Sequence, residues 1–184
     1  MHDSNNVDWP VPANLHIGGS VRREGWVNLD IQPGPHVDRV GNCVSLAQFA
    51  DASFETVYAS HVLEHLGYHR DLGAALAEIH RVLKPGGKAM ISVPDLEILC
   101  RMFVHPELDE KSRFHIMRVM FGGQMDEHDF HRVGLSWPIF GDYLRRAGFQ
   151  SLRRVEAFGI FDDASSLKLF GHRISLNVEA RKPA

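Results

Sequence analysis

The sequence predicts an α/β, Rossmann-like fold in which a mostly parallel β-sheet is covered by helices. Strand-like and helix-like stretches alternate along the chain, which is typical of a parallel sheet. The 184 residues, 44% of them hydrophobic, are enough for one domain with a substantial core and short for two. The stretch "LHIGGSVRREGWVNLD" opens like a mononucleotide-binding unit, with an apolar strand, two glycines and an acidic residue that closes a second strand.

The first connection between strands is unusually short. In dinucleotide-binding domains the acidic residue lies about 20 residues beyond the glycines, because a helix joins the two strands. Here only residues 20–25 separate Gly19 from Trp26, whereas a parallel crossover generally needs about a dozen residues or more. We therefore expect a tight, irregular first crossover without its helix.

The first half of the chain contains five predicted strands and one helix. The first four strands are "NLHIG", "GWVNLDI", a weaker "HVDRVGN" and "FETVYAS", the last rich in β-favouring residues. The helix covers "DLGAALAEIHRVL", where apolar residues recur every three or four positions on one face: Leu72, Leu76, Ile79 and Leu83. "KPGG" ends this helix, because proline cannot continue it and glycine tolerates a sharp turn, and "KAMISVPD" is the fifth strand.

The second half contains two predicted helices, "LEILCRMFV" and "SWPIFGDYLRRAGF", separated by an irregular region around "FGGQMDEHDFHRVG". Two strands follow, "SLRRVEAF" and "HRISLNVEARK". No repeat or linker divides the chain, so we expect a single domain over 1–184, with an N-terminal extension at about 1–13 and a substrate-side insertion at about 104–134. Within this insertion, paired glycines and few apolar residues favour a mobile lid at 122–134, the alternative being a surface loop that touches nothing.

The composition and charge of the chain limit the classes of binding partner and the cellular compartment to expect. A formal net charge of −3 carries no basic excess, so we do not expect nucleic-acid binding. No apolar run approaches the roughly 18 residues of a membrane span, and the opening "MHDSNNVDWPVPAN" lacks a signal-peptide pattern, which favours the cytoplasm. Cys43 and Cys100 are too few for a disulfide framework or a thiolate zinc site, so both are expected to be reduced.

Several of these stretches together resemble a known family. "LHIGGS", "GWVNLD", "FETVYASHVLEHL", "LAEIHRVLKPGGKAMISVPD" and "YLRRAGF" are similar to the class I methyltransferases that use S-adenosylmethionine, of the methyltransferase type 11 kind. The resemblance covers the chain from residue 14 to about residue 149. It implies a seven-stranded sheet with a final antiparallel strand, helices on both faces, and S-adenosylmethionine lying across the carboxyl ends of the first strands.

The resemblance also implies which residues hold the cofactor. They lie at the carboxyl ends of the first four strands: Gly18, Gly19, Ser20, Asp30, Ile31, Asn42, Cys43 and Ser60. The glycines and Ser20 would approach the methionine part, Asp30 the ribose hydroxyls, and Ile31 with Asn42 and Cys43 the adenine. Ser60 and His61 would close the site.

Two departures from the family pattern predict low cofactor affinity. The glycine loop is short, and Asn42 stands where the family often carries aspartate, so a hydrogen bond to the adenine amino group would lack charge assistance. We therefore expect binding of micromolar strength at best.

Methyl transfer requires a base only when the acceptor must lose a proton. His61 in "HVLEH" and His131 in "DEHDFHR" are the predicted catalytic, acceptor-side residues, with His65 and His128 one helical turn or less away from them in the sequence. The alternative for the first motif is structural: His61 satisfies backbone groups at a strand end, and Glu64 pairs with an arginine. The predicted acceptor is a small molecule or saccharide.

Two other functions are compatible with the sequence. The short glycine loop is compatible with a methyltransferase-like domain that has lost catalysis and serves in binding or assembly. The "DEHDFH" stretch suggests a metal-dependent hydrolase, but loops rich in aspartate and histidine are more often solvated than metal-bound, so no metal site is predicted there.

Overall fold

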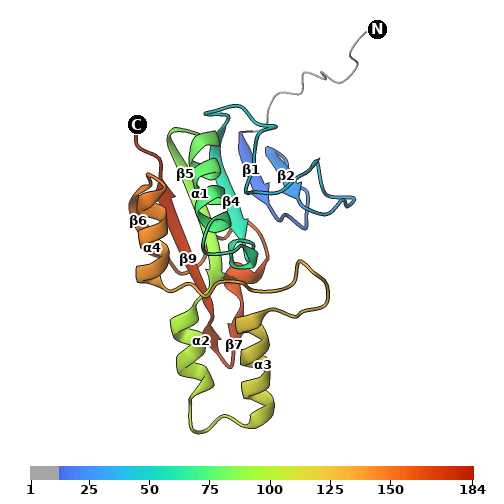
Figure 1. Cartoon of the computed structure of the whole chain (residues 1–184), viewed down its shortest axis with the longest axis vertical. Helices are drawn as coiled ribbons and strands as arrows, with labels where there is room; N and C mark the ends of the chain where they lie inside the picture. Colours follow the sequence, from blue (N-terminus) through green and yellow to red (C-terminus); the bar gives the residue numbers. More distant parts are fainter. Residues whose placement is uncertain (1–12) are drawn as a thin grey trace.

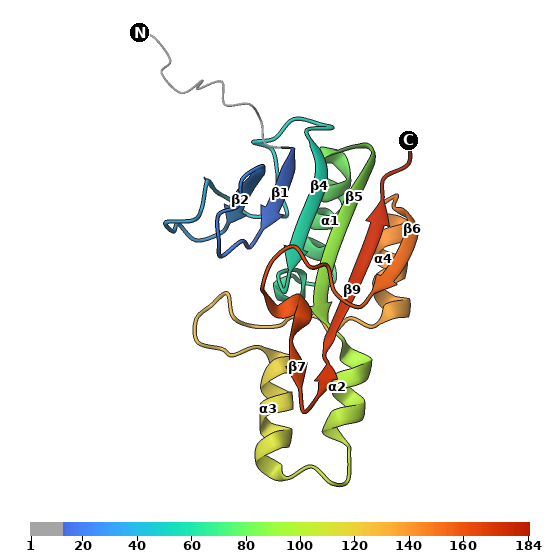
Figure 2. The ribbon, with the colours of Figure 1, turned by 180° about the vertical axis from the view of Figure 1, so that it is seen from behind.

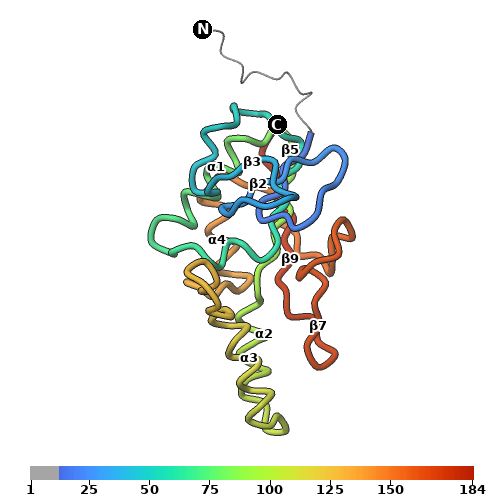
Figure 3. The backbone as a smooth tube through the Cα atoms, turned by 90° about the vertical axis from the view of Figure 1, so that its right-hand side faces the viewer, coloured from blue at the N-terminus to red at the C-terminus, as the bar shows by residue number. Residues whose placement is uncertain are grey.

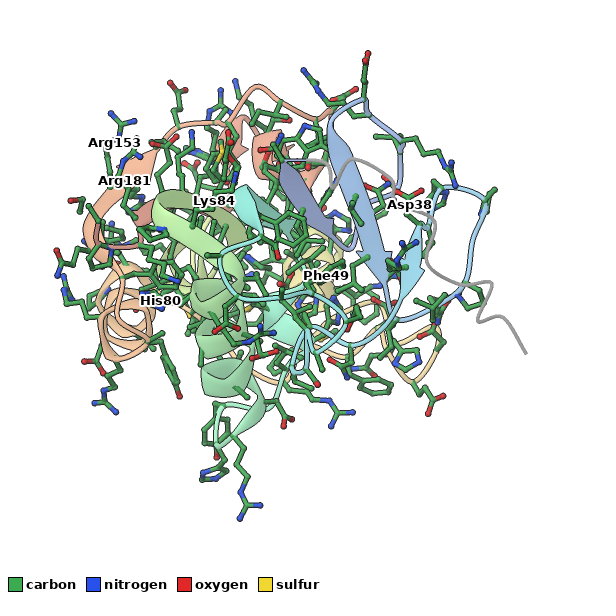
Figure 4. The ribbon with its side chains drawn as sticks, turned by 90° about the horizontal axis from the view of Figure 1, so that it is seen from above. Asp38, Phe49, His80, Lys84, Arg153 and Arg181 are labelled. Carbon is green, nitrogen blue, oxygen red and sulfur yellow. The ribbon has the colours of Figure 1, made fainter. Side chains whose placement is uncertain are left out.

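A computed structural model describes residues 13–184, and it is built on one seven-stranded sheet (Figure 1). The strands follow the order β3 (Arg39–Val40), β2 (Trp26–Asp30), β1 (Asn14–Ile17), β4 (Phe54–Ser60), β5 (Leu83–Pro94), β9 (Ser175–Arg181) and β6 (Gln150–Val155). The first five are mutually parallel, and β9 is antiparallel to both neighbours. Viewed along the strands, Asp38 beside β2 and Arg153 on β6 mark the two opposite edges (Figure 4). The predicted fold class, with its final antiparallel strand, is confirmed.

One face of the sheet is covered by α1 (Asp71–Val82) and α4 (Trp137–Arg146) (Figure 1). The predicted stripe of α1 is fully buried, because Leu72, Leu76 and Ile79 pack onto inward-facing strand residues such as Val57. Leu83, predicted as the end of this helix, is instead the first residue of β5, paired with Phe54. The "KPGG" stretch accordingly lies within β5, next to an irregularity in its pairing with β4.

The opposite face carries no α-helix in the described part of the chain, so the α-helices that cover the sheet lie on one face and not on both as expected (Figure 2). The physical reason is the length of the connections, since residues 18–25 and 31–38 join the first three strands without room for a helix. Segment 156–167, between β6 and β9, covers this face instead and includes the short 3₁₀ turn η2 (Ala164–Ser166). Its Phe161 ring lies 4.1 Å from the His16 ring, centre to centre, and Asp163 accepts a 2.7 Å hydrogen bond from the Tyr58 hydroxyl.

A helical hairpin extends beyond the carboxyl ends of the strands (Figure 3). It consists of α2 (Leu96–Phe103) and α3 (Glu110–Phe121), and the two-stranded sheet β7 (Lys168–Leu169) and β8 (His172–Arg173) lies beside it. A separate small core holds the hairpin through Leu99, Met102, Ile116 and Ile174. α3 was not predicted from the sequence, because Ile116 is its one fully buried residue and no apolar stripe marks the helix.

The buried His16 predicts a pH dependence of stability. His16 is 4% exposed, and burial lowers its pKa to about 4 from the usual 6.5. Between pH 6.5 and about 4, His16 is therefore protonated in the unfolded chain and neutral in the folded chain. The free energy of unfolding should accordingly fall as the pH drops through this range. At the lower limit the loss from this residue is roughly 3 kcal/mol.

Urea denaturation of the parent and of His16→Gln, measured between pH 7 and 4.5, isolates this contribution. Every other titrating group is common to both proteins, so the difference in unfolding free energy should shift in favour of the variant as the pH falls. Parallel pH profiles would show that His16 titrates normally in the folded protein.

Candidate functional site

An open pocket of about 530 Å³ lies at the carboxyl edge of the sheet, between the loops that follow β1, β2, β3 and β4. Six of the residues predicted from the sequence line it: Gly18, Asp30, Ile31, Asn42, Cys43 and His61. Gly19, Ser20, Ser60 and His131 do not line it. The parallel strands bring the first group together, because each of these residues is at or just beyond the end of its own strand.

Asp30 ends β2, and its position is held locally. Its Oδ1 accepts a 2.8 Å hydrogen bond from the Gln32 backbone amide, and its own carbonyl accepts one from the Gly41 amide. These bonds hold the carboxylate at the strand end, where it lines the pocket beside Ile31. A carboxylate in this position can accept hydrogen bonds from a ligand's hydroxyl groups.

The turn after β3 supplies the next part of the wall. The side-chain oxygen of Asn42 accepts a 3.1 Å hydrogen bond from the Val44 amide, and its carbonyl accepts one from Ser45. Cys43 is buried, and burial raises the pKa of its thiol to about 11, so it stays protonated and acts as an apolar contact. Both cysteines are free, and Cys100 is exposed.

The two glycines have different roles. Gly18 lines the pocket, has a φ of 72°, and its amide donates a 2.8 Å hydrogen bond to the Leu29 carbonyl. A Cβ at Gly19 would instead lie 2.7 Å from His16 Nδ1 and 2.8 Å from the Asn28 side chain, on the other side of the sheet. Gly19 is therefore required for packing beneath the loop, which the glycine motif alone could not distinguish from cofactor approach.

Asn28 is a structural residue that the sequence analysis did not single out. It is 1% exposed, and its side-chain amide donates to the Val21 carbonyl at 2.7 Å and to the His36 carbonyl at 3.0 Å. One buried amide thus holds both short loops, where related folds would use helices. The sequence offered no signal for this role beyond a polar residue in the middle of an apolar strand.

His61 follows β4 and has both ring nitrogens directed at protein groups. Its backbone is left-handed, with a φ of 55°, Nε2 lies 2.9 Å from Ser175 Oγ, and Nδ1 lies 3.4 Å from Glu64 Oε1. Burial lowers the pKa of His61 to about 4, so the ring is neutral at pH 7. His61 therefore presents a neutral ring to the pocket, with Nε2 hydrogen-bonded to Ser175.

Glu64 is the most unusual charged residue of the site. It lies in the short 3₁₀ turn η1 (Leu63–His65), is 1% exposed, and neither carboxylate oxygen has a hydrogen-bond partner within residues 13–184. Burial raises its pKa to about 8. Its ionisable neighbours are His61 and, at 3.9 Å, His131 Nε2, so the expected pairing with an arginine is wrong.

Segment 122–134 lies against η1. The Arg132 amide donates a 2.7 Å hydrogen bond to the Glu64 carbonyl, and the His131 ring packs edge-on against His65 at 4.8 Å between centres. Glu127, His128 and Arg132 of this segment line the pocket, while His131 sits behind His65. The alternative of a loop that touches nothing is therefore wrong.

Residues 25–91 match a family model described as a methyltransferase domain. A solved S-adenosylmethionine-dependent methyltransferase from Archaeoglobus fulgidus has a TM-score of 0.58 and 16% identity, covering 94% of this chain and 89% of its own. Two further solved structures each cover 93% of this chain. The CurJ carbon methyltransferase has a TM-score of 0.57 and 12% identity. Phosphoethanolamine N-methyltransferase 2 of Haemonchus contortus, in complex with S-adenosyl-L-methionine, has a TM-score of 0.56 and 13% identity. The chain spans about half the length of these last two, 48% in each case. No curated protein matches the chain.

The resemblance seen in the sequence is confirmed at the level of fold and domain. The chain has the Rossmann-like fold of the solved class I methyltransferases, and its 25–91 segment matches the methyltransferase domain model. Within residues 13–184, no helix has the length and apolar character needed to cross a membrane.

The packing role of Gly19 can be tested by substitution. Gly19→Ala should lower the free energy of unfolding by roughly 1–3 kcal/mol, because the added methyl group meets two buried side chains that cannot move freely. Gly73→Ala is the matched control, since the exposed Gly73 lies within α1 and an added Cβ meets nothing within 4 Å. It should be neutral or stabilise the protein by up to about 1 kcal/mol. Equal stability of Gly19→Ala and the parent in urea denaturation would contradict the packing role.

Proposed function

We propose that this protein is an S-adenosylmethionine-dependent methyltransferase that acts on a small-molecule or saccharide acceptor. The observation that carries the proposal is the convergence of Asp30, Ile31, Asn42 and Cys43 on one pocket at the carboxyl edge of the sheet. This is where open α/β sheets bind their ligands. The methyltransferase domain match and the relative that binds S-adenosyl-L-methionine support the choice of cofactor.

The residues of the pocket fit the parts of S-adenosylmethionine. The volume of the pocket, about 530 Å³, lies within the range of small-molecule sites, roughly 300–1,000 Å³. The Asp30 carboxylate offers acceptors for the ribose hydroxyls, Ile31 and Cys43 offer apolar contacts for the adenine, and Gly18 allows close backbone approach to the methionine part. When bound, the cofactor would supply an electrophilic methyl group on its sulfonium.

The chain's own contribution to the reaction is to orient the acceptor and exclude water. In this proposal the chain is a single domain, and segment 122–134 of the 104–134 insertion is the lid over the acceptor side, through Glu127, His128 and Arg132. His61 and His131 act as positioning residues, because His61 Nε2 is bonded to Ser175 and the His131 ring packs against His65. His65 and His128 are the imidazoles that line the pocket beside them.

Calorimetry with S-adenosylmethionine and S-adenosylhomocysteine tests the cofactor site. Both should bind with roughly micromolar affinity and raise the unfolding temperature, since a ligand of the folded state stabilises it by mass action. Asp30→Ala should weaken binding by about tenfold or more, because charge-assisted hydrogen bonds to the ribose are lost.

Asp30→Asn and Asp142→Ala serve as controls for this test. The asparagine retains an acceptor for the Gln32 amide and should give an intermediate affinity. Asp142 pairs with Arg146 on α4, away from the pocket, and its substitution should leave affinity unchanged. Absence of binding at millimolar ligand, or parent-like affinity of Asp30→Ala, would contradict the proposed cofactor site.

A methyltransferase-like domain without turnover is the second candidate. The engagement of His61 Nε2 by Ser175 and the helix-free first crossover favour it. S-adenosylhomocysteine binding without transfer of a labelled methyl group to any member of a broad acceptor panel would support this candidate over the first.

A further inference from the structure

The carboxylate of Glu64 is buried and, among residues 13–184, has no lysine or arginine paired with it. Both oxygens are buried and without a hydrogen-bond donor among the described residues, and no lysine or arginine makes an ion pair with them. A buried carboxylate without donors is strongly unfavourable unless it is protonated or bound to a cation. Burial accordingly raises the pKa of Glu64 to about 8.

Two histidines complete a group of metal-ligating atoms around this carboxylate. One oxygen or ring nitrogen from each of Glu64, His65 and His131 lies within 4.8 Å of the others, and Glu64 Oε1 is 3.9 Å from His131 Nε2. Ligand atoms in a tetrahedral site with bonds of about 2.0–2.2 Å stand roughly 3.3–3.6 Å apart, so a small inward shift would close the group.

The hydrogen bonding of His65 favours a ligating role. Its Nδ1 lies 3.2 Å from the Phe130 carbonyl, which can only accept, so this nitrogen carries the proton in the neutral ring. The lone pair is then left on Nε2. A metal-bound histidine commonly has this arrangement, with its second nitrogen donating to a backbone carbonyl that orients the ring.

The position of the group places it between the pocket and the lid. His65 lines the pocket and belongs to η1, whereas His131 comes from segment 122–134, which is attached to η1 by the hydrogen bond from Arg132 to Glu64. An ion at this point would join the two segments. Its remaining coordination positions would face the pocket on the side of His65.

We propose that Glu64, His65 and His131 bind one divalent transition-metal ion, which holds segment 122–134 against η1 at the wall of the pocket. Two imidazoles and one carboxylate are the donors that Zn²⁺, Mn²⁺ and Fe²⁺ accept, whereas Mg²⁺ and Ca²⁺ prefer oxygen ligands alone. Of the "DEHDFH" stretch, only His131 takes part. The site is independent of whether the protein transfers methyl groups.

The test uses untagged full-length protein treated with a chelator, because a histidine tag would bind the same ions. Titration with Zn²⁺ and Mn²⁺ in a calorimeter should show one site per chain, and the bound ion should raise the unfolding temperature. Glu64→Gln, His65→Ala and His131→Ala should each weaken binding by roughly a hundredfold or more. Circular dichroism confirms that each variant is folded.

His128→Ala is the matched control, since His128 lies on the same segment and lines the pocket but is outside the ligand group. It should bind metal as the parent does. No binding by the folded parent, or equal binding by His131→Ala and His128→Ala, would overturn the proposal. S-adenosylhomocysteine binding measured in the same samples tests the cofactor site separately, so either proposal can fail without the other.

Discussion

The eight-residue connection between β1 and β2 is the constraint on which much of the structure depends. Residues 18–25 cannot form the helix that a parallel crossover normally contains, and the next connection, residues 31–38, is also too short. The strands nevertheless stay parallel, because the buried amide of Asn28 holds both loops and Gly19 leaves room for the side chains beneath it. The strand order of the sheet is therefore maintained although one of its faces carries no α-helix within residues 13–184.

The face of the sheet that lacks α-helices is covered by a segment from the C-terminal part of the chain. Polar and aromatic side chains such as His16 and Tyr58 point from the strands to this face and must be removed from water. Segment 156–167 does this with Phe161 against the rings and Asp163 against the Tyr58 hydroxyl. A segment that the sequence pattern shows only as a connection thus replaces a layer of helices.

The carboxyl edge of the sheet gathers two kinds of group side by side. The ends of β2 and β3 supply the carboxylate and apolar contacts suited to a nucleoside, while η1 and segment 122–134 supply histidines around a buried glutamate. The second group depends on a close approach of residues almost 70 positions apart, His65 and His131. Their proximity to the pocket would connect any ion bound there to the position of segment 122–134.

The sequence by itself determined the elements whose signal is local. The β-favouring residues of "FETVYAS" correspond to all of β4, the apolar stripe marks α1, and the acidic end of "GWVNLD" places Asp30 at the edge where ligands bind. The first two features depend on periodicity and on neighbours in the chain, so they can be predicted from it directly. The family resemblance added the seven strands with a final antiparallel one and six of the pocket residues.

Only the tertiary structure decided which face of the sheet has helices, that Gly19 packs against His16, and that His61 Nε2 is bonded to Ser175. It also revealed α3, whose one buried residue is contributed to a core formed by distant segments. The burial of Glu64 was equally invisible, because the sequence shows a glutamate between histidines but not what surrounds it. Burial, pKa and hydrogen-bond satisfaction depend on residues brought together by folding, and no local pattern encodes them.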